Sequence, residues 1–175
     1  MDKKINRLAP VIWGSTIMTA ISVLPFLNLI NLFFCAGIII GGYFGVISYY
    51  RQIMGTPVRL TYKDGVLVGV LSGFLAAVTV SVINVVMLMY SDANPVTEGL
   101  SMLGEFGKNL PPEVNQQMNK LADEFNKYGF SPTLTIFTFI SNIIIYPLFG
   151  AIGALIATAL IDRKIGNSGE SGNPK

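Results

Sequence analysis

The sequence contains no histidine and only one cysteine among its 175 residues. Without histidine, the chain lacks the commonest general base and the commonest metal ligand of proteins. Cys35 cannot form a disulfide within the chain, and a single thiolate does not make a zinc site. The sequence also shows no paired carboxylates, phosphate-binding loop or nucleophile with a neighbouring base. It therefore predicts no catalytic residue, no metal site, no cofactor and no enzymatic activity.

Charged residues are scarce and unevenly placed. They make up 13% of the chain, about half the share found in a soluble domain. No charged residue occurs at 8–50, 65–91 or 128–161. Charge-free apolar runs longer than about 18 residues are typical of membrane spans, so we expect an integral membrane protein. The formal net charge of +2 gives no indication of a nucleic-acid partner.

The three apolar runs divide into four predicted helices. A membrane span needs about 20 residues, so the first run is long enough for two helices joined by a turn at 28–31. A cleaved signal peptide is the alternative for the first helix, but no small-x-small cleavage site follows it promptly. The fold class is therefore all-α, a four-transmembrane-helix bundle in one membrane domain over 1–165. The predicted spans are 8–27, 32–50, 65–90 and 132–161, with an outer loop at 91–131 and a disordered tail at 166–175.

Four residues predict details of the later spans. Asp64 is the expected N-cap of the third span. Ser131 followed by Pro132 is a favourable pair for the N-cap and first turn of the fourth. Pro147 lies inside that fourth span, where we expect it to kink the helix.

The distribution of basic residues predicts the orientation. With four spans, both termini and the 51–64 loop share one side, which carries nine Lys and Arg against four acidic residues. The other side carries three basic and six acidic residues. Because Lys and Arg collect on the cytoplasmic side, we expect cytoplasmic termini, an outer loop at 92–130 and a location in the bacterial inner membrane.

Small residues recur at every fourth position on the second and third spans. Helices in lipid gain little hydrophobic energy by associating, so glycine-zipper rows that allow close backbone approach are typical of packing faces. The simplest interpretation is that spans two and three pack against each other, and the alternative is that one row forms a homo-oligomer. The rows are Gly37, Gly41 and Gly45, then Gly65, Gly69 and Gly73; Gly150 and Ala154 belong to a shorter face on the fourth span.

The outer loop contains an amphipathic pattern with helix-starting prolines at 111–112 and a helix-ending glycine at 129. We expect a helix over 112–128. It is predicted to lie in the headgroup layer or against the spans, and the alternative is a lid over a pore or docking surface. Its apolar face consists of Val114, Met118, Leu121 and Phe125.

The spans contain no ionisable acid or base of the kind that marks ion and proton paths. Asn84 and Asn142 each lie 20 residues from a charged residue at the predicted cytoplasmic boundary, hence at one height near the outer interface. Together with Tyr146 they are candidates for a polar outer mouth. The plainer alternative is an interhelical hydrogen bond worth about 0.6 kcal/mol.

Several short segments resemble a family of small four-span bacterial membrane proteins of unknown function. They are the segments SYYR at 48–51, LTYKDG at 60–65 and FTFI at 137–140, with Pro147 and the closing DRK at 162–164. The resemblance covers about residues 32–164 and implies the four-span topology. That family has no assigned functional residues, so it implies none here, and the glycine rows depart from its pattern.

These features favour a non-enzymatic packing, assembly or regulatory component of a membrane. Its expected partners are the lipid bilayer and either another membrane protein or further copies of this chain. The alternative function is a small oligomeric transporter or channel subunit for a neutral solute.

Overall fold

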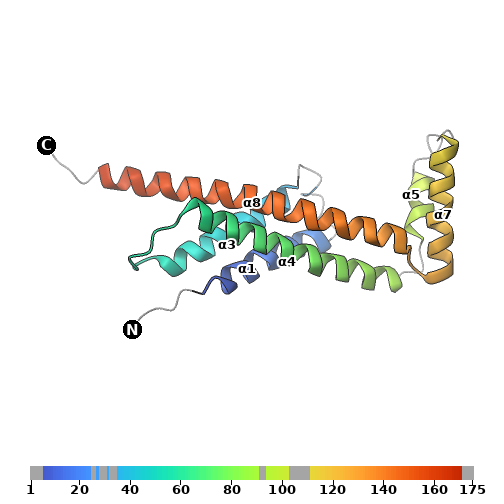
Figure 1. Cartoon of the computed structure of the whole chain (residues 1–175), viewed down its shortest axis with the longest axis horizontal. Coiled ribbons are helices and arrows are strands. Elements are labelled where there is room, and N and C mark those ends of the chain that lie inside the picture. The colour runs from blue at the N-terminus through green and yellow to red at the C-terminus, as the bar shows by residue number, and fades with distance from the viewer. Residues whose placement is uncertain are drawn as a thin grey trace. The chain divides into compact units, whose positions relative to one another are not determined.

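The computed structural model describes residues 6–24, 27, 31, 35–90, 94–102 and 111–170. All regular secondary structure in these residues is helical, which confirms the all-α class. The chain divides into two compact units, residues 1–80 with 142–175, and residues 81–141. The helices are α1 (Leu8–Val23), α3 (Ala36–Ile53), α4 (Tyr62–Met89), α5 (Pro95–Met102), α7 (Pro112–Tyr128) and α8 (Pro132–Glu170) (Figure 1).

Within the described residues, two helical segments are long and apolar enough to cross a membrane, Tyr62–Met89 and Pro132–Ile165. α1 is apolar but has only 16 residues. α3 has 18 residues, and its last turn includes Arg51 and Gln52, which lower its apolar content. Helix length and composition therefore support two spans directly and leave the four-span arrangement as a proposal.

Two helix ends differ from the sequence-based prediction. α1 ends at Val23 rather than at 27, and Leu24 is extended, with φ −76° and ψ 121°. Leu24 precedes Pro25, and a residue before proline is disfavoured in the helical region. α8 instead continues through Pro147 and on to Glu170, past the predicted start of the disordered tail. Once a long helix exists, each further residue adds one hydrogen bond without a new nucleation cost.

The N-cap of α4 is Thr61 rather than Asp64, and the helix begins three residues earlier than predicted. The Thr61 hydroxyl accepts a hydrogen bond from the Asp64 amide at 3.2 Å and donates one to the Asp64 carboxylate at 2.6 Å. Arg7 forms an ion pair with the same carboxylate at 2.8 Å. Asp64 thus occupies the third helical position of a capping arrangement, where it also ties the start of α4 to the residue before α1.

α1, α3, α4 and α8 all contribute to the core of the first unit, and α1 and α3 pack side by side (Figure 1). Two clusters of buried residues make up this core. One contains Val11, Val46, Tyr49, Ile53, Val68, Ala154 and Ala157, and the other contains Met18, Ile38, Ala76, Ala77, Val80 and Tyr146.

The glycine row of α3 packs mainly against α1. A Cβ added at Gly41 would lie 3.0 Å from the Gly14 carbonyl oxygen and would collide with the Met18 side chain. A Cβ at Gly37 would collide with Ile21, again from α1. α1 precedes α3 along the described chain, and elements that are close in sequence are usually adjacent in space.

The glycine row of α4 packs mainly against α8 rather than against the row of α3. The predicted contact between the second and third apolar helices is present at Gly45, where an added Cβ would lie 3.4 Å from the Ser72 hydroxyl oxygen and 3.4 Å from the Val68 side chain of α4. A Cβ at Gly69 would collide with the Gly150 carbonyl oxygen and would lie 2.6 Å from the Ala154 Cβ. At Gly73 it would collide with the Tyr146 carbonyl group. The four-residue period identifies a face that allows close approach, and it does not determine which helix fills that face.

In the second unit, α7 has the predicted bounds. Gly129 ends it with φ +76°, and its amide donates to the Phe125 carbonyl at 2.8 Å. The apolar face is covered only toward this end: Phe125 is 6% exposed, whereas Val114 is exposed. Met118 and Leu121 are half-buried.

Glu124 joins the end of α7 to the start of α8 within the second unit. Its carboxylate accepts hydrogen bonds from the Ser131 hydroxyl at 2.6 Å, the Thr133 hydroxyl at 2.7 Å and the Thr133 amide at 3.1 Å. Ser131 is the N-cap of α8, as predicted, because its hydroxyl accepts the Leu134 amide at 3.1 Å. The hydroxyl and amide donors hold the pKa of Glu124 below its ordinary value of 4.5.

The hydrogen bonds of Glu124 predict that local stability at the start of α8 depends on pH. Folding lowers the pKa of Glu124, so the ionised carboxylate stabilises the folded state. This stabilisation is present above pH 4.5 and is lost as the pH falls through the pKa of the folded state. We expect the Thr133 and Leu134 amides to lose protection from hydrogen exchange below that pH, after correction for intrinsic rates. Glu124→Gln should remove this pH dependence and Glu113→Gln should keep it. Unchanged protection down to pH 3 in the wild type would contradict the role of Glu124.

Candidate functional site

The predicted outer mouth falls into different units of the structure. Asn84 lines a cavity of about 460 Å³ in the second unit. Tyr146 is buried in the core of the first unit, and Asn142 belongs to that unit as well. Equal height along two helices does not fix the direction of a side chain around each helix axis.

The cavity of the second unit combines polar groups with apolar walls. Ser81 and Asn84 come from the last turns of α4, and Thr135 and Thr138 come from the first turns of α8. Such a mixture is typical of sites for small neutral molecules. The apolar walls include Val85, Leu88, Leu134 and Phe139.

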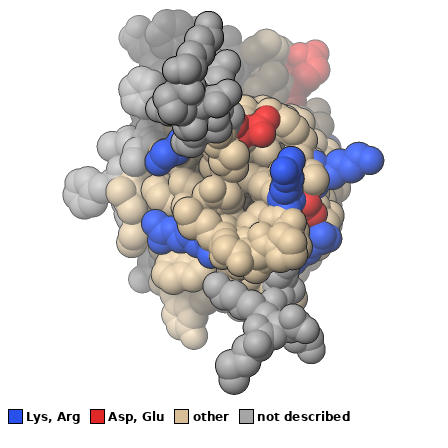
Figure 2. Space-filling model, turned by 90° about the vertical axis from the view of Figure 1, so that its left-hand side faces the viewer, with Lys and Arg blue, Asp and Glu red and all other residues tan. Residues whose placement is uncertain are grey.

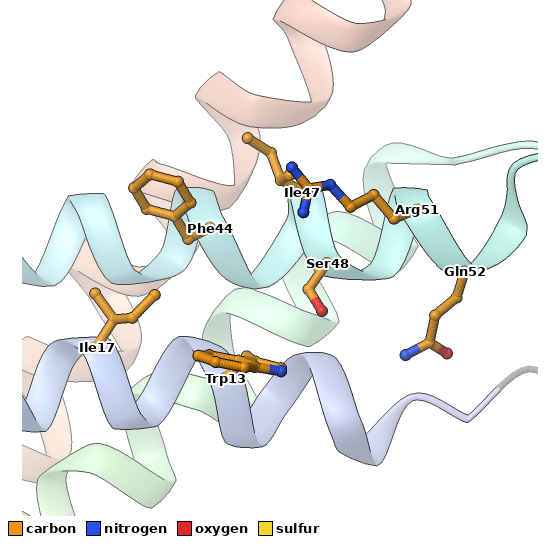
Figure 3. A pocket seen from close by; sticks show the side chains of 7 residues that line it. All are labelled: Trp13, Ile17, Phe44, Ile47, Ser48, Arg51 and Gln52. Atoms are coloured by element: carbon orange, nitrogen blue, oxygen red, sulfur yellow. The ribbon is translucent and has the colours of Figure 1, made fainter.

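A second candidate site is a groove of about 450 Å³ between α1 and α3 in the first unit, here called the α1–α3 groove. Figure 3 shows Ser48 and Gln52 pointing from α3 toward α1, and the Arg51 side chain folding back toward Ile47. The Trp13 indole forms part of the α1 wall (Figure 3). The lining residues are Trp13, Ile17, Phe44, Ile47, Ser48, Arg51 and Gln52.

The α1–α3 groove is apolar along most of its length and cationic where α3 ends. Trp13 is 61% exposed and Phe44 is 46% exposed. Arg51 has no ion-pair partner among the residues that the structure describes, whereas Arg7 is paired with Asp64 at 2.8 Å. The guanidinium of Arg51 is therefore available to an anionic ligand.

Other basic residues occur in the same unit, and Figure 2 shows Lys and Arg distributed around one face of the molecule. Acidic side chains are fewer on that face (Figure 2). The described basic residues of the first unit are Arg7, Arg51, Arg59, Lys63, Arg163 and Lys164.

The α1–α3 groove was not predicted from the sequence, although the residues of its α3 wall follow a helical spacing. Phe44, Ile47, Ser48 and Arg51 have spacings of three, one and three residues, which place them on one face of a helix. The other wall depends on Trp13, and no pattern within α3 indicates that α1 supplies it.

The family comparison covers both candidate sites. Residues 11–159 match the family described as "Protein of unknown function (DUF4199)". The chain belongs to this family. The DUF4199 match begins within α1 and therefore extends beyond the predicted resemblance at its N-terminal side. No curated protein and no solved structure matches the chain.

Proposed function

We propose that this DUF4199 protein is an integral membrane protein in which α1, α3, α4 and α8 cross the bacterial inner membrane. One observation carries the proposal: large apolar side chains point outward on all four helices, and small residues fill the space between the helices. The buried small residues include Gly14, Gly41, Gly69, Gly73, Ala76, Gly150 and Ala154. The exposed large ones include Ile12, Trp13, Phe44, Leu71, Phe74, Ile144, Leu148 and Leu160.

This distribution by size is the reverse of what water favours. A soluble protein gains roughly 1.5–3 kcal/mol by burying each large apolar side chain, and contiguous exposed apolar surface is rare on it. In lipid, the same side chains are already in an apolar solvent. The favourable contacts between helices then come from close backbone approach at small residues.

We place both termini and the 54–61 connection on the cytoplasmic side. The basic residues at the ends of α3 and α8 support this orientation, because Lys and Arg concentrate on that side of bacterial membranes. The loop at 92–130, which includes α5 and α7, then lies on the outer side.

The role proposed for the chain is a non-enzymatic packing, assembly or regulatory component of a membrane complex. The exposed apolar faces of the four helices offer surface for a membrane-protein partner or a second copy. The absence of any Asp, Glu, Lys or Arg from 65–91 and 128–161 disfavours ion-coupled transport.

The cavity around Asn84 favours a second candidate, a transporter or channel subunit for a neutral solute. Its polar side chains provide hydrogen-bonding groups that an uncharged polar molecule requires.

Solute permeation separates these two functions. For the assembly role, vesicles containing the purified protein should swell in glycerol or urea at the same rate as protein-free vesicles. Faster swelling that Asn84→Leu abolishes, and that the matched Asn119→Leu on α7 leaves unchanged, would replace the assembly role with transport. Asn119 is exposed and does not line the cavity.

A further inference from the structure

We propose that the α1–α3 groove binds a phospholipid with a net negative headgroup. Arg51 holds the phosphate, and an acyl chain lies along Phe44 and Ile47. This inference rests on the proposed membrane insertion, because lipid reaches the groove only if α1 and α3 lie in a bilayer.

The apolar wall of the groove fits a hydrocarbon chain. Phe44 and Ile47 continue toward Arg51 on one face of α3. The helix rises about 10 Å between Phe44 and Arg51. Ile17 provides apolar surface on the facing helix (Figure 3). Because this surface is open rather than enclosed within the core, an acyl chain can enter from the side.

The polar end of the groove fits a phosphate diester. Arg51 is exposed and without an ion pair among the described residues, and guanidinium groups bind phosphate oxygens through two parallel hydrogen bonds. The Ser48 hydroxyl points into the same groove (Figure 3). The side-chain carbonyl oxygen of Gln52 accepts a hydrogen bond from the backbone N–H of Asn6 at 3.3 Å, so the side-chain NH₂ group of Gln52 remains as a donor.

The order of these groups matches the profile of a membrane leaflet. Hydrocarbon contacts come first along α3, and the cation follows in its last turn. Tryptophan is enriched at the membrane interface, and basic pockets between helices on the cytoplasmic side bind anionic headgroups. The positive charge of Arg51 favours an anionic lipid over a zwitterionic one, and the apolar wall favours a lipid over a water-soluble anion.

Trp13 reports on the groove directly, because it is the only tryptophan of the chain. The protein is placed in vesicles that contain either brominated phosphatidylglycerol or brominated phosphatidylcholine at equal mole fraction. Bromine on the acyl chains quenches a neighbouring indole. We expect the anionic lipid to quench Trp13 at a several-fold lower mole fraction than the zwitterionic lipid.

Arg51→Gln should reduce this preference about fivefold, the effect expected for one cation near a membrane surface. Arg163→Gln, a matched change outside the groove, should leave the preference unchanged. Equal quenching by the two lipids, or a preference that survives Arg51→Gln, would overturn the lipid site and leave membrane insertion standing.

A reference indole separates failure of the site from failure of insertion. Phe74 is exposed on α4, so Phe74→Trp combined with Trp13→Phe should be quenched similarly by both lipids. If neither lipid quenches this variant, the chain is not inserted and the proposed function fails. If this variant is quenched while Trp13 in the wild type is shielded from both lipids, protein covers the groove and the lipid site is overturned.

Discussion

Replacing Gly69 with leucine is expected to destabilise the first unit by about 1–3 kcal/mol. Even the Cβ of the new side chain would collide with the Gly150 carbonyl oxygen. That atom belongs to the backbone of α8, so relief requires the two helices to separate. The change should be measured as a lower unfolding midpoint in detergent.

The structure predicts an order of effects among glycine substitutions. Gly69→Ala should cost more than Gly41→Ala, because the added Cβ collides with the backbone of another helix at Gly69, whereas at Gly41 the nearest backbone atom of another helix, the Gly14 carbonyl oxygen, lies 3.0 Å away. Gly99 is the matched control, since nothing lies within 4 Å of a Cβ added there. Gly99→Ala should be neutral or slightly stabilising because alanine favours helix more than glycine does. Wild-type unfolding of Gly69→Leu would contradict the close packing of α4 on α8.

Replacing Phe125 with serine is expected to loosen the second unit by about 3–5 kcal/mol, the range for removing a buried aromatic side chain. Phe125 is 6% exposed, and its burial supports the C-terminal half of α7. The loss should expose α7 to trypsin, which cleaves after Lys120 and Lys127. Limited proteolysis of vesicle-inserted protein measures this directly.

Val114→Ser is the matched control, because Val114 lies on the same apolar face but is 41% exposed. It should change the cleavage rate little. If Phe125→Ser resists trypsin as well as the wild type does, the burial assigned to α7 is wrong. A lid would require Phe125→Ser also to alter solute permeation, and we expect no such change.

Several helix ends could be predicted accurately from the sequence, because each depends on one residue at that end. Pro112 and Gly129 predict the two ends of α7, because each acts through its own backbone conformation. Ser131 predicts the start of α8 for the same reason. Thr61 and Asp64 show the limit, since two adequate capping residues lie three positions apart and only the structure identifies which one begins the helix.

Features that depend on contact between helices were predictable only in part. The period of Gly65, Gly69 and Gly73 identifies a close-packing face, but the partner follows from the arrangement of all four helices. The α1–α3 groove was missed because Trp13 and Arg51 are 38 residues apart in sequence. Neither residue is unusual until the two helices lie side by side.

Labelling of single cysteines in intact cells is the most direct test of four spans with both termini in the cytoplasm. The variants are Asn115→Cys, Thr56→Cys and Ser168→Cys, each in a Cys35→Ala background. We expect a membrane-impermeant thiol reagent to label Asn115→Cys from outside and to label the other two only after the membrane is opened. External labelling of Ser168→Cys in intact cells would contradict this topology.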